Sequence, residues 1–244
     1  MKTKLIYLVL IVGIISQCKE TTTEELDFEF GYDYFLNPEI GKYVEYKVDT
    51  LYFDDSGNFT VSKFVREEVR DFFINEQEDT IYRIEQFVKD SLNGNWSISS
   101  VLSLSIQDNQ AIKTEGNLKF LKMIFPPREN TTFESTKFID ELIEVKIGSE
   151  FIEMYKNWNS EIETINIPES IGNLNFPEVL SVTYADDENL IEKRLYQEKY
   201  VKGIGLAYKR IEIMDDAENP NGSLPWEDRA EKGFISTWEI IDFN

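Results

Sequence analysis

Alternating apolar and polar residues, in one long run after another, most constrain the fold of this chain. In residues 59–74, for example, Val65 and Val69 fall on one face of an extended strand, while Arg66 and Glu68 fall on the other. Successive side chains of a strand point to opposite faces. This period of two therefore predicts antiparallel strands, each with one buried face.

Turn-forming residues separate these runs, as at residues 54–58 and 93–95, where Asp, Asn and Gly favour tight turns. Strands are expected at residues 42–53, 59–74, 80–89, 96–106, 119–125, 139–147, 161–167, 179–184, 191–200, 206–214 and 234–243. The only helix predicted covers residues 150–157, and prolines are expected to break residues 168–177 into a loop.

Long consecutive strands with one apolar face must curl around a core or pack on a second layer. The predicted fold is therefore mainly β with little helix: a strongly curved antiparallel sheet or a partly closed, lipocalin-like barrel. A two-sheet β-sandwich is the alternative. No linker rich in Pro, Gly or Ser divides the chain, so residues 31–244 are expected to form a single β-rich domain.

The N-terminus has the features of a lipoprotein signal peptide. Two lysines precede an apolar run at residues 5–15, and the sequence Ile-Ser-Gln-Cys at residues 15–18 resembles a bacterial lipobox. A helix of this length covers about 16 Å, roughly half of a bilayer core, so the run is expected to be a signal rather than a span. We expect cleavage after residue 17, acylation of Cys18, and a flexible acidic tether over residues 18–30. A secretory signal with a chance cysteine is the alternative.

Composition excludes several classes of function. The formal net charge of −21 makes binding to nucleic acid or to anionic lipid headgroups unfavourable. The chain has no histidine, which excludes Ser-His-Asp and Cys-His catalysis and His-ligated metal sites. Cys18 is the only cysteine, so no disulfide forms within the chain. Neither a metal nor a cofactor is expected.

Glu67 is the most informative charged residue, because it lies between Val65 and Val69 on the expected core face. A buried carboxylate must be paired or must change its pKa. Arg83, on the next predicted strand, is the candidate partner in a buried ion pair. The competing interpretation is a catalytic acid in a two-carboxylate glycoside hydrolase. No second carboxylate stands at a recognisable spacing, so the structural pair is favoured.

Two aromatic residues, Phe125 and Trp226, follow or adjoin prolines in predicted loops. Exposed, they would mark a binding surface; folded back, they would cover the core. The pair Gly203 and Gly205 lacks the third glycine of a dinucleotide loop and is interpreted as a bend at the start of a strand. The acidic stretch at residues 215–222 lacks an EF-hand register and is interpreted as a solvated loop.

Short stretches spread over most of the mature chain carry a resemblance to a known family. They are Tyr34-Phe35, residues 41–46, Val48-Asp49-Thr50, residues 66–73, residues 82–85, Trp96, residues 115–126 and residues 200–206. They resemble a family of lipoproteins from Bacteroidota that open with Tyr-Phe-Pro-Leu-x-x-Gly and later contain Tyr-Ala-Lys-Gly-Val-Gly-Leu. The opening departs from that pattern at residues 36–38, where Leu-Asn-Pro replaces Pro-Leu.

The resemblance implies shared ancestry, an outer-membrane lipid anchor, and a fold like the curved open barrel of the lipoprotein carriers LolA and LolB. It leaves the periplasmic face and the cell surface both open, and it implies no particular activity.

Together these observations favour a non-enzymatic binding or assembly module of the cell envelope. It would bind an envelope protein or an apolar ligand on an aromatic-lined concave sheet, and reach the membrane through its lipid anchor. The alternatives are a carboxylate-based glycoside hydrolase, a carrier of lipid or other hydrophobic ligands, and a purely structural spacer. The sequence identifies neither the ligand nor the oligomeric state.

Overall fold

The computed structural model describes residues 30–35, 39–54, 57–216 and 222–244. Within these residues, twelve strands form one antiparallel sheet. They are β1 (Tyr43–Phe53), β2 (Phe59–Ile74), β3 (Thr80–Lys89), β4 (Ser97–Gln107), β5 (Gln110–Glu115), β6 (Leu118–Ile124), β7 (Thr131–Phe133), β10 (Ser160–Ile171), β11 (Leu174–Glu188), β12 (Glu192–Val201), β13 (Gly205–Asp215) and β14 (Lys232–Phe243). The remaining elements are the hairpin of β8 (Glu144–Ile147) and β9 (Glu150–Glu153), the 3₁₀ turn η1 (Tyr32–Tyr34) and the short helix α2 (Trp226–Arg229).

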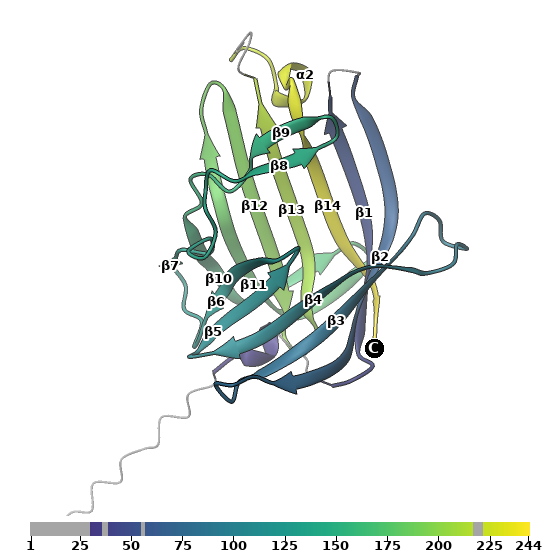
Figure 1. The fold of residues 1–244 in the computed structure, drawn as a ribbon, viewed down its shortest axis with the longest axis vertical. Coiled ribbons are helices and arrows are strands. Elements are labelled where there is room, and N and C mark those ends of the chain that lie inside the picture. Colours follow the sequence, from purple (N-terminus) through teal and green to yellow (C-terminus); the bar gives the residue numbers. More distant parts are fainter. Residues whose placement is uncertain (1–29, 36–38, 55–56, 217–221) are drawn as a thin grey trace, which may run out of the picture.

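The sheet consists of two meanders joined along one pair of strands. Its order is β6-β5-β4-β3-β2-β1-β14-β13-β12-β11-β10-β7, so the first and last strands, β1 and β14, are neighbours, with Val44 opposite Phe243. The two edges approach each other on the far side, where the Leu121 amide on β6 donates to the Ser135 carbonyl just after β7, at 2.9 Å. The sheet is thus nearly closed into a barrel (Figure 1).

Irregularities in the register help the sheet to curve. The register of β1 on β14 shifts at Glu45, that of β2 on β3 shifts between Val69 and Asp71, and that of β12 on β13 shifts between Lys199 and Tyr200. Such bulges bend a strand and increase its twist. The curved sheet encloses an interior between the two meanders.

The β8–β9 hairpin covers part of one face of the sheet (Figure 1). Ile152 of β9 is buried in a cluster with Ile213 of β13 and Phe234 of β14. This apolar contact fixes the hairpin across the inner face of the second meander, and with it the segment that follows β9.

The structure confirms the expected mainly β fold with a curved, partly closed sheet. Strands 59–74 and 80–89 have the predicted bounds. The sandwich alternative is wrong, because the twelve strands of the barrel are hydrogen-bonded side by side in one continuous sheet rather than in two. Alternation therefore identified the architecture, although the short strands β5, β7 and β9 were missed.

Three local predictions are wrong. Residues 150–157 are not a helix: the positive φ of Gly148 allows a tight turn that pairs β8 with β9, with Val145 opposite Ile152. Of residues 139–147, only the last four form a strand. Residues 168–177 do not form a loop, because β10 and β11 run through both prolines.

The prolines are tolerated because each lies where a neighbouring strand is missing. β7 pairs with β10 only at residues 160–162, which leaves Pro168 on a free edge, and the pairing of β12 with β11 begins at Val179, beyond Pro177. Proline is accepted at such edges because it has no N–H to donate.

No helix among the described residues is long and apolar enough to cross a membrane. Cys18, the predicted signal peptide at residues 1–17 and all but the last residue of the predicted tether lie outside the described part of the chain.

Candidate functional site

Charged side chains are buried inside the barrel, on the inward-facing sides of strands from both meanders. On β12 the alternation that buries Tyr196 and Tyr200 also buries Glu198 between them, with only 1% of its surface exposed. The charged side chains of this interior cluster are Lys113 on β5, Lys122 on β6, Glu198 on β12 and Lys209 on β13, with Glu67 on β2 and Glu115 on β5 beside them. A buried charge is costly unless it is paired, so the partners of each lysine define the site.

Glu198 is the best-satisfied member of the interior cluster. Its Oε2 lies 2.7 Å from the Nζ of Lys122, and the hydroxyls of Tyr196 and Tyr200 both donate to its carboxylate. Burial alone would raise the pKa of Glu198, but the ammonium groups of Lys122, Lys209 and Lys113 lower it to about 2. Glu198 is therefore an anion, and its charge is already matched.

Lys122 is matched in turn. Its ammonium also contacts the Tyr196 hydroxyl at 3.2 Å and lies 3.8 Å from the centre of the Tyr184 ring. Burial lowers the pKa of Lys122 to about 8, against the opposing effect of Glu198. The cation is held by a carboxylate and by aromatic faces.

Lys113 lies between two carboxylates. Its Nζ is 3.2 Å from Glu115 Oε2 and 3.5 Å from Glu67 Oε1. Burial lowers the pKa of Lys113, but the carboxylates outweigh burial and raise it above its usual value. Lys113 in turn lowers the pKa of Glu115 to about 2. The buried ammonium of Lys113 is thus stabilised by two carboxylates, the largely buried Glu67 and the partly exposed Glu115, whose side chain is 41% exposed.

Lys209 differs from the other two lysines. It is 5% exposed, and its Nζ lies 3.6 Å from the centre of the Trp238 ring on the neighbouring strand. Among the described residues, no carboxylate lies within ion-pair distance of it and no side chain accepts a hydrogen bond from it. Burial, followed by the repulsion of Lys113, lowers the pKa of Lys209, against the opposing effect of Glu115, Glu198 and Glu67. Within the described residues, its closest contact is an aromatic face rather than a carboxylate.

Two cavities adjoin the interior cluster, and Lys113 lines both. The larger has a volume of about 530 Å³ and lies between β5–β6, β12–β13, β8 and the segment after β9. Its wall includes all three buried lysines. The smaller, of about 70 Å³, reaches Glu67, Glu198 and Tyr200 from the end of the barrel near η1.

Aromatic side chains form the apolar wall of the larger cavity. Trp158 packs edge-on against Tyr155 and Tyr196, with ring centres 5.4 and 4.9 Å away, and Phe120 lies 5.6 Å from Tyr155. The Trp158 Nε1 donates to the Met154 carbonyl at 2.9 Å, so its indole is fixed in place. The cavity therefore combines a rigid aromatic wall with buried ammonium groups.

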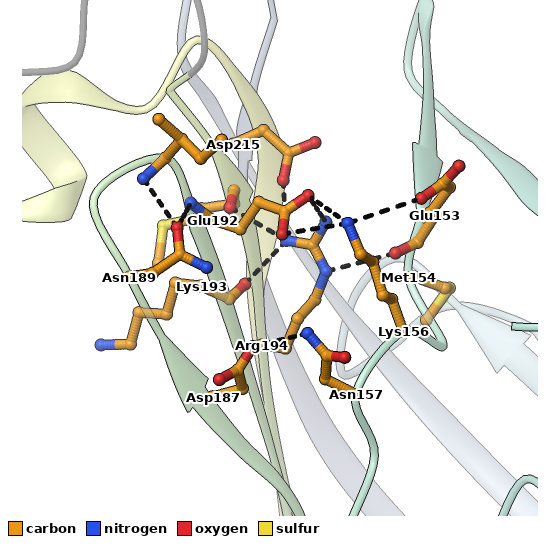
Figure 2. Close-up of polar contacts among 12 residues, drawn as sticks. Glu153, Met154, Lys156, Asn157, Asp187, Asn189, Glu192, Lys193, Arg194 and Asp215 are labelled. Atoms are coloured by element: carbon orange, nitrogen blue, oxygen red, sulfur yellow. Dashed lines mark hydrogen bonds and ion pairs between the residues drawn. The ribbon is translucent and has the colours of Figure 1, made fainter. Parts of the chain in front are cut away.

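Arg194 connects the end of β9, and with it the segment that follows, to the sheet (Figure 2). Its guanidinium is buried and donates to the backbone carbonyls of Glu153 and Met214, at 3.2 and 3.0 Å. It also lies 2.7 Å from Asp215 Oδ1. A second ion pair, Lys156 with Glu192 at 3.2 Å, joins the same segment to β12. This network gives the cavity wall a fixed connection to the sheet.

The predicted pair of Glu67 and Arg83 is wrong, although Glu67 does lie on the inner face. Glu67 stands opposite Gln86, whose Nε2 donates to it at 3.1 Å. The register shift after Val69 places Arg83 opposite Asp71, which it pairs with at 3.2 Å on the outer face. The interior partner of Glu67 is Lys113, from a strand that the sequence did not reveal.

Of the two alternatives for Phe125 and Trp226, the structure shows the one in which they fold back on the core, so they do not form a binding surface. Phe125 is 4% exposed and packs edge-on against Tyr32, with ring centres 4.8 Å apart. Trp226 is 6% exposed, in a cluster with Phe53, and is covered by the Arg229 guanidinium. Both fold back on the core because their large apolar surfaces gain more from burial than from contact with water.

Sequence reasoning missed the lysines and Glu198. The signal for Glu198 was present, since a carboxylate between Tyr196 and Tyr200 at a spacing of two follows the pattern that identified Glu67. Lys209, between Ala207 and Ile211, follows the same pattern. Nothing in a single strand, however, shows which charges meet across the interior. Within the described residues no group of three acidic side chains is placed to hold a metal ion.

Comparisons with protein-family models, with curated proteins and with solved structures found no match to this chain. Membership of the Bacteroidota lipoprotein family, and the likeness to LolA and LolB, therefore stay predictions. The function has to be argued from the geometry of the cavity and of the interior cluster.

Proposed function

We propose that this protein is a non-enzymatic binding module of the cell envelope, whose larger cavity encloses a small ligand with an apolar body. The observation that carries the proposal is the cavity itself, of about 530 Å³ inside the barrel. Small-molecule sites typically have about 300–1,000 Å³, with apolar and aromatic walls and a few polar groups that orient the ligand. Phe120, Tyr155 and Trp158 provide such a wall, and the buried lysines provide the polar groups.

The carboxylates of the interior cluster favour binding over glycoside hydrolysis. A glycosidase needs one carboxyl group that is protonated at the working pH, so that it can donate to the leaving oxygen. Glu115 and Glu198 have pKa values of about 2 and are ionised near neutral pH. Lysines contact both of them, and Lys113 and Gln86 contact Glu67, the candidate acid from the sequence, so each carboxylate of the interior cluster already has a partner.

The proposal places this module on the outer membrane through an acylated Cys18. Residues 18–30 would serve as a tether that extends to roughly 40 Å, which allows the barrel to stand clear of the bilayer. Mass spectrometry of the N-terminal peptide from the native host tests this part. A peptide that begins at residue 18 with acyl chains is expected, and an unmodified Cys18 would contradict it.

Equilibrium dialysis tests the cavity. The full chain, held in lipid nanodiscs, is dialysed against the uncharged probe 4-phenylbutan-1-ol, with protein-free nanodiscs as the correction for partition into lipid. Val145 of β8 lines the cavity, so Val145→Trp is expected to fill it and abolish retention of the probe. Ile211→Phe, on the opposite wall, is expected to act in the same direction.

Val101→Trp is the matched control, because Val101 lies on the outer face of β4 with 48% of its surface exposed. It is expected to retain the probe as the wild type does. The proposal is wrong if the wild type retains no more probe than protein-free nanodiscs do. It is equally wrong if the two filling variants, shown to be folded by circular dichroism, retain the probe in full.

A further inference from the structure

Lys209 is the one buried lysine of the larger cavity that, among the described residues, has no carboxylate within ion-pair distance. Lys122 has Glu198 at 2.7 Å, and Lys113 has Glu115 at 3.2 Å. Lys209 lines the same cavity, yet Trp238 is its only close partner in the described part of the chain. A cation that is removed from water without an anion is costly to bury. The cavity wall thus contains a buried ammonium that makes no direct ion pair and is placed to contact an anionic group of a ligand.

The surroundings of Lys209 limit that charge to one. On the adjoining strand, Glu198 stands directly opposite Lys209, and Glu115 lines the same cavity. Both are ionised, as their pKa values of about 2 require. A second negative charge on the ligand would meet these carboxylates at short range in a poorly screened interior. A dianion such as a phosphate monoester is therefore disfavoured relative to a carboxylate.

The rest of the cavity wall is apolar. Phe120, Tyr155 and Trp158 form a continuous aromatic surface. Ile211 lies two residues from Lys209 on β13, on the same face of the strand. Aromatic faces contribute large contact areas and favour flat apolar groups. A ligand that used both parts of the wall would need one charged end and one apolar body.

We propose that the cavity selects a monocarboxylate with an apolar body, whose carboxylate lies against the ammonium of Lys209. This inference rests on the proposed function and adds the chemical class of the ligand. The charge-assisted hydrogen bond from Lys209 supplies the direct contact with an anion that Lys209 lacks within the described residues. The apolar body packs against the aromatic wall.

The experiment compares three probes of the same shape: 4-phenylbutyrate, 4-phenylbutan-1-ol and 4-phenylbutylamine. The full chain in nanodiscs is dialysed against each, and bound probe is measured by mass spectrometry after correction with protein-free nanodiscs. The wild type is expected to bind the acid roughly tenfold more tightly than the alcohol, because hydrogen bonds to charged groups are the stronger ones. The amine is expected to bind least.

Lys209→Met removes the charge and keeps the apolar volume. We expect this variant to lose the preference for the acid while it still binds the alcohol, and the retained alcohol shows that the cavity is intact. Lys209→Arg keeps the charge and is expected to keep the preference. Lys47, exposed on β1 and paired with Asp49 away from both cavities, is the matched control, and Lys47→Met is expected to leave the preference unchanged.

The outcomes separate this inference from the proposed function. If the wild type binds the alcohol as tightly as the acid, or the amine most tightly, the inference is wrong and the binding module stands. The inference is also wrong if Lys209→Met keeps the preference or if Lys47→Met loses it. If none of the three probes is retained beyond the lipid correction, the proposed function fails as well.

Discussion

Glu198 and Lys122 face each other across the interior of the barrel, with Oε2 and Nζ 2.7 Å apart. Their strands, β12 and β6, are not neighbours in the sheet. The ion pair therefore joins two walls that backbone hydrogen bonds do not connect directly. Both side chains are almost completely buried, so the pair is held in a poorly solvated interior, where losing one partner is costly.

Lys122→Met is expected to destabilise the protein, because it leaves Glu198 as an unpaired buried anion. The free energy of unfolding, measured by urea titration, should fall by about 3–5 kcal/mol. The double variant Lys122→Met/Glu198→Gln should regain part of this loss. Lys156→Met removes a cation from a more exposed pair and should cost less than about 1 kcal/mol. A Lys122→Met variant as stable as Lys156→Met would contradict this account.

Acid is expected to weaken the fold through Glu198. The pKa of Glu198 is lowered in the folded protein from 4.5 to about 2, so the unfolded chain binds more protons between these values. The stability that this carboxylate contributes is complete above the unfolded value and is lost as the pH falls towards 2. Urea titrations from pH 6 to pH 2 should show a shallower acid decline for Glu198→Gln than for the wild type.

Glu141→Gln is the control for this acid titration, since Glu141 is exposed in a turn. Its acid decline should follow that of the wild type. If Glu198→Gln declines as steeply as the wild type does, Glu198 is not the group that confers the acid sensitivity.

Arg194→Met is expected to loosen the segment after β9. The substitution removes the donor to the Glu153 and Met214 carbonyls and leaves Asp215 without its closest cation. Amide hydrogen exchange should accelerate in residues 144–158, and the free energy of unfolding should fall by about 3–5 kcal/mol. Arg83→Met, on the outer face, should change exchange in that segment little. Unchanged protection in the Arg194 variant would show that the apolar contacts of β9 suffice.

The partner of Glu67 can be identified by double-mutant cycles. Glu67 Oε1 lies 3.5 Å from Lys113 Nζ, whereas Arg83 pairs with Asp71 and Glu85. The cycle of Glu67→Gln with Lys113→Met should give a coupling energy of about 1 kcal/mol, and the cycle with Arg83→Met should give none beyond error. A coupling energy between Glu67 and Arg83, with none between Glu67 and Lys113, would instead support the ion pair that the sequence predicted.

Strands were predictable wherever alternation and turn chemistry agreed locally. Residues 59–74 and 80–89 have apolar residues at a period of two and turns at both ends, so their bounds were predicted correctly. Residues 150–157 failed because a four-residue strand is too short to show its period. The prolines at 168 and 177 led to the wrong prediction of a loop, because the sequence does not show which strand edges stay unpaired.

The site was less predictable than the fold, because it depends on contacts between distant strands. The inward direction of Glu67 followed from its own neighbours. Its pairing with Lys113 did not, since it requires β5 to come close to β2 across a curved sheet and a register shift after Val69 to turn Arg83 outward. The absence of a direct carboxylate partner for Lys209 among the described residues likewise depends on how the strands assemble, so it could not be predicted from the sequence around Lys209.

The pairing of β1 with β14 has a consequence for the order in which the molecule is assembled. Val44 is opposite Phe243, so β1, which already pairs with β2, finds its second neighbour only after the other described strands of the sheet have been synthesised. Until then the first meander has an open edge, and open edges invite pairing with other chains. Contacts this far apart in sequence also form slowly. Truncation just before residue 232 would therefore remove the only strand between β1 and β13 in the described sheet, and would leave two half-shells joined at the far edge and by interior contacts.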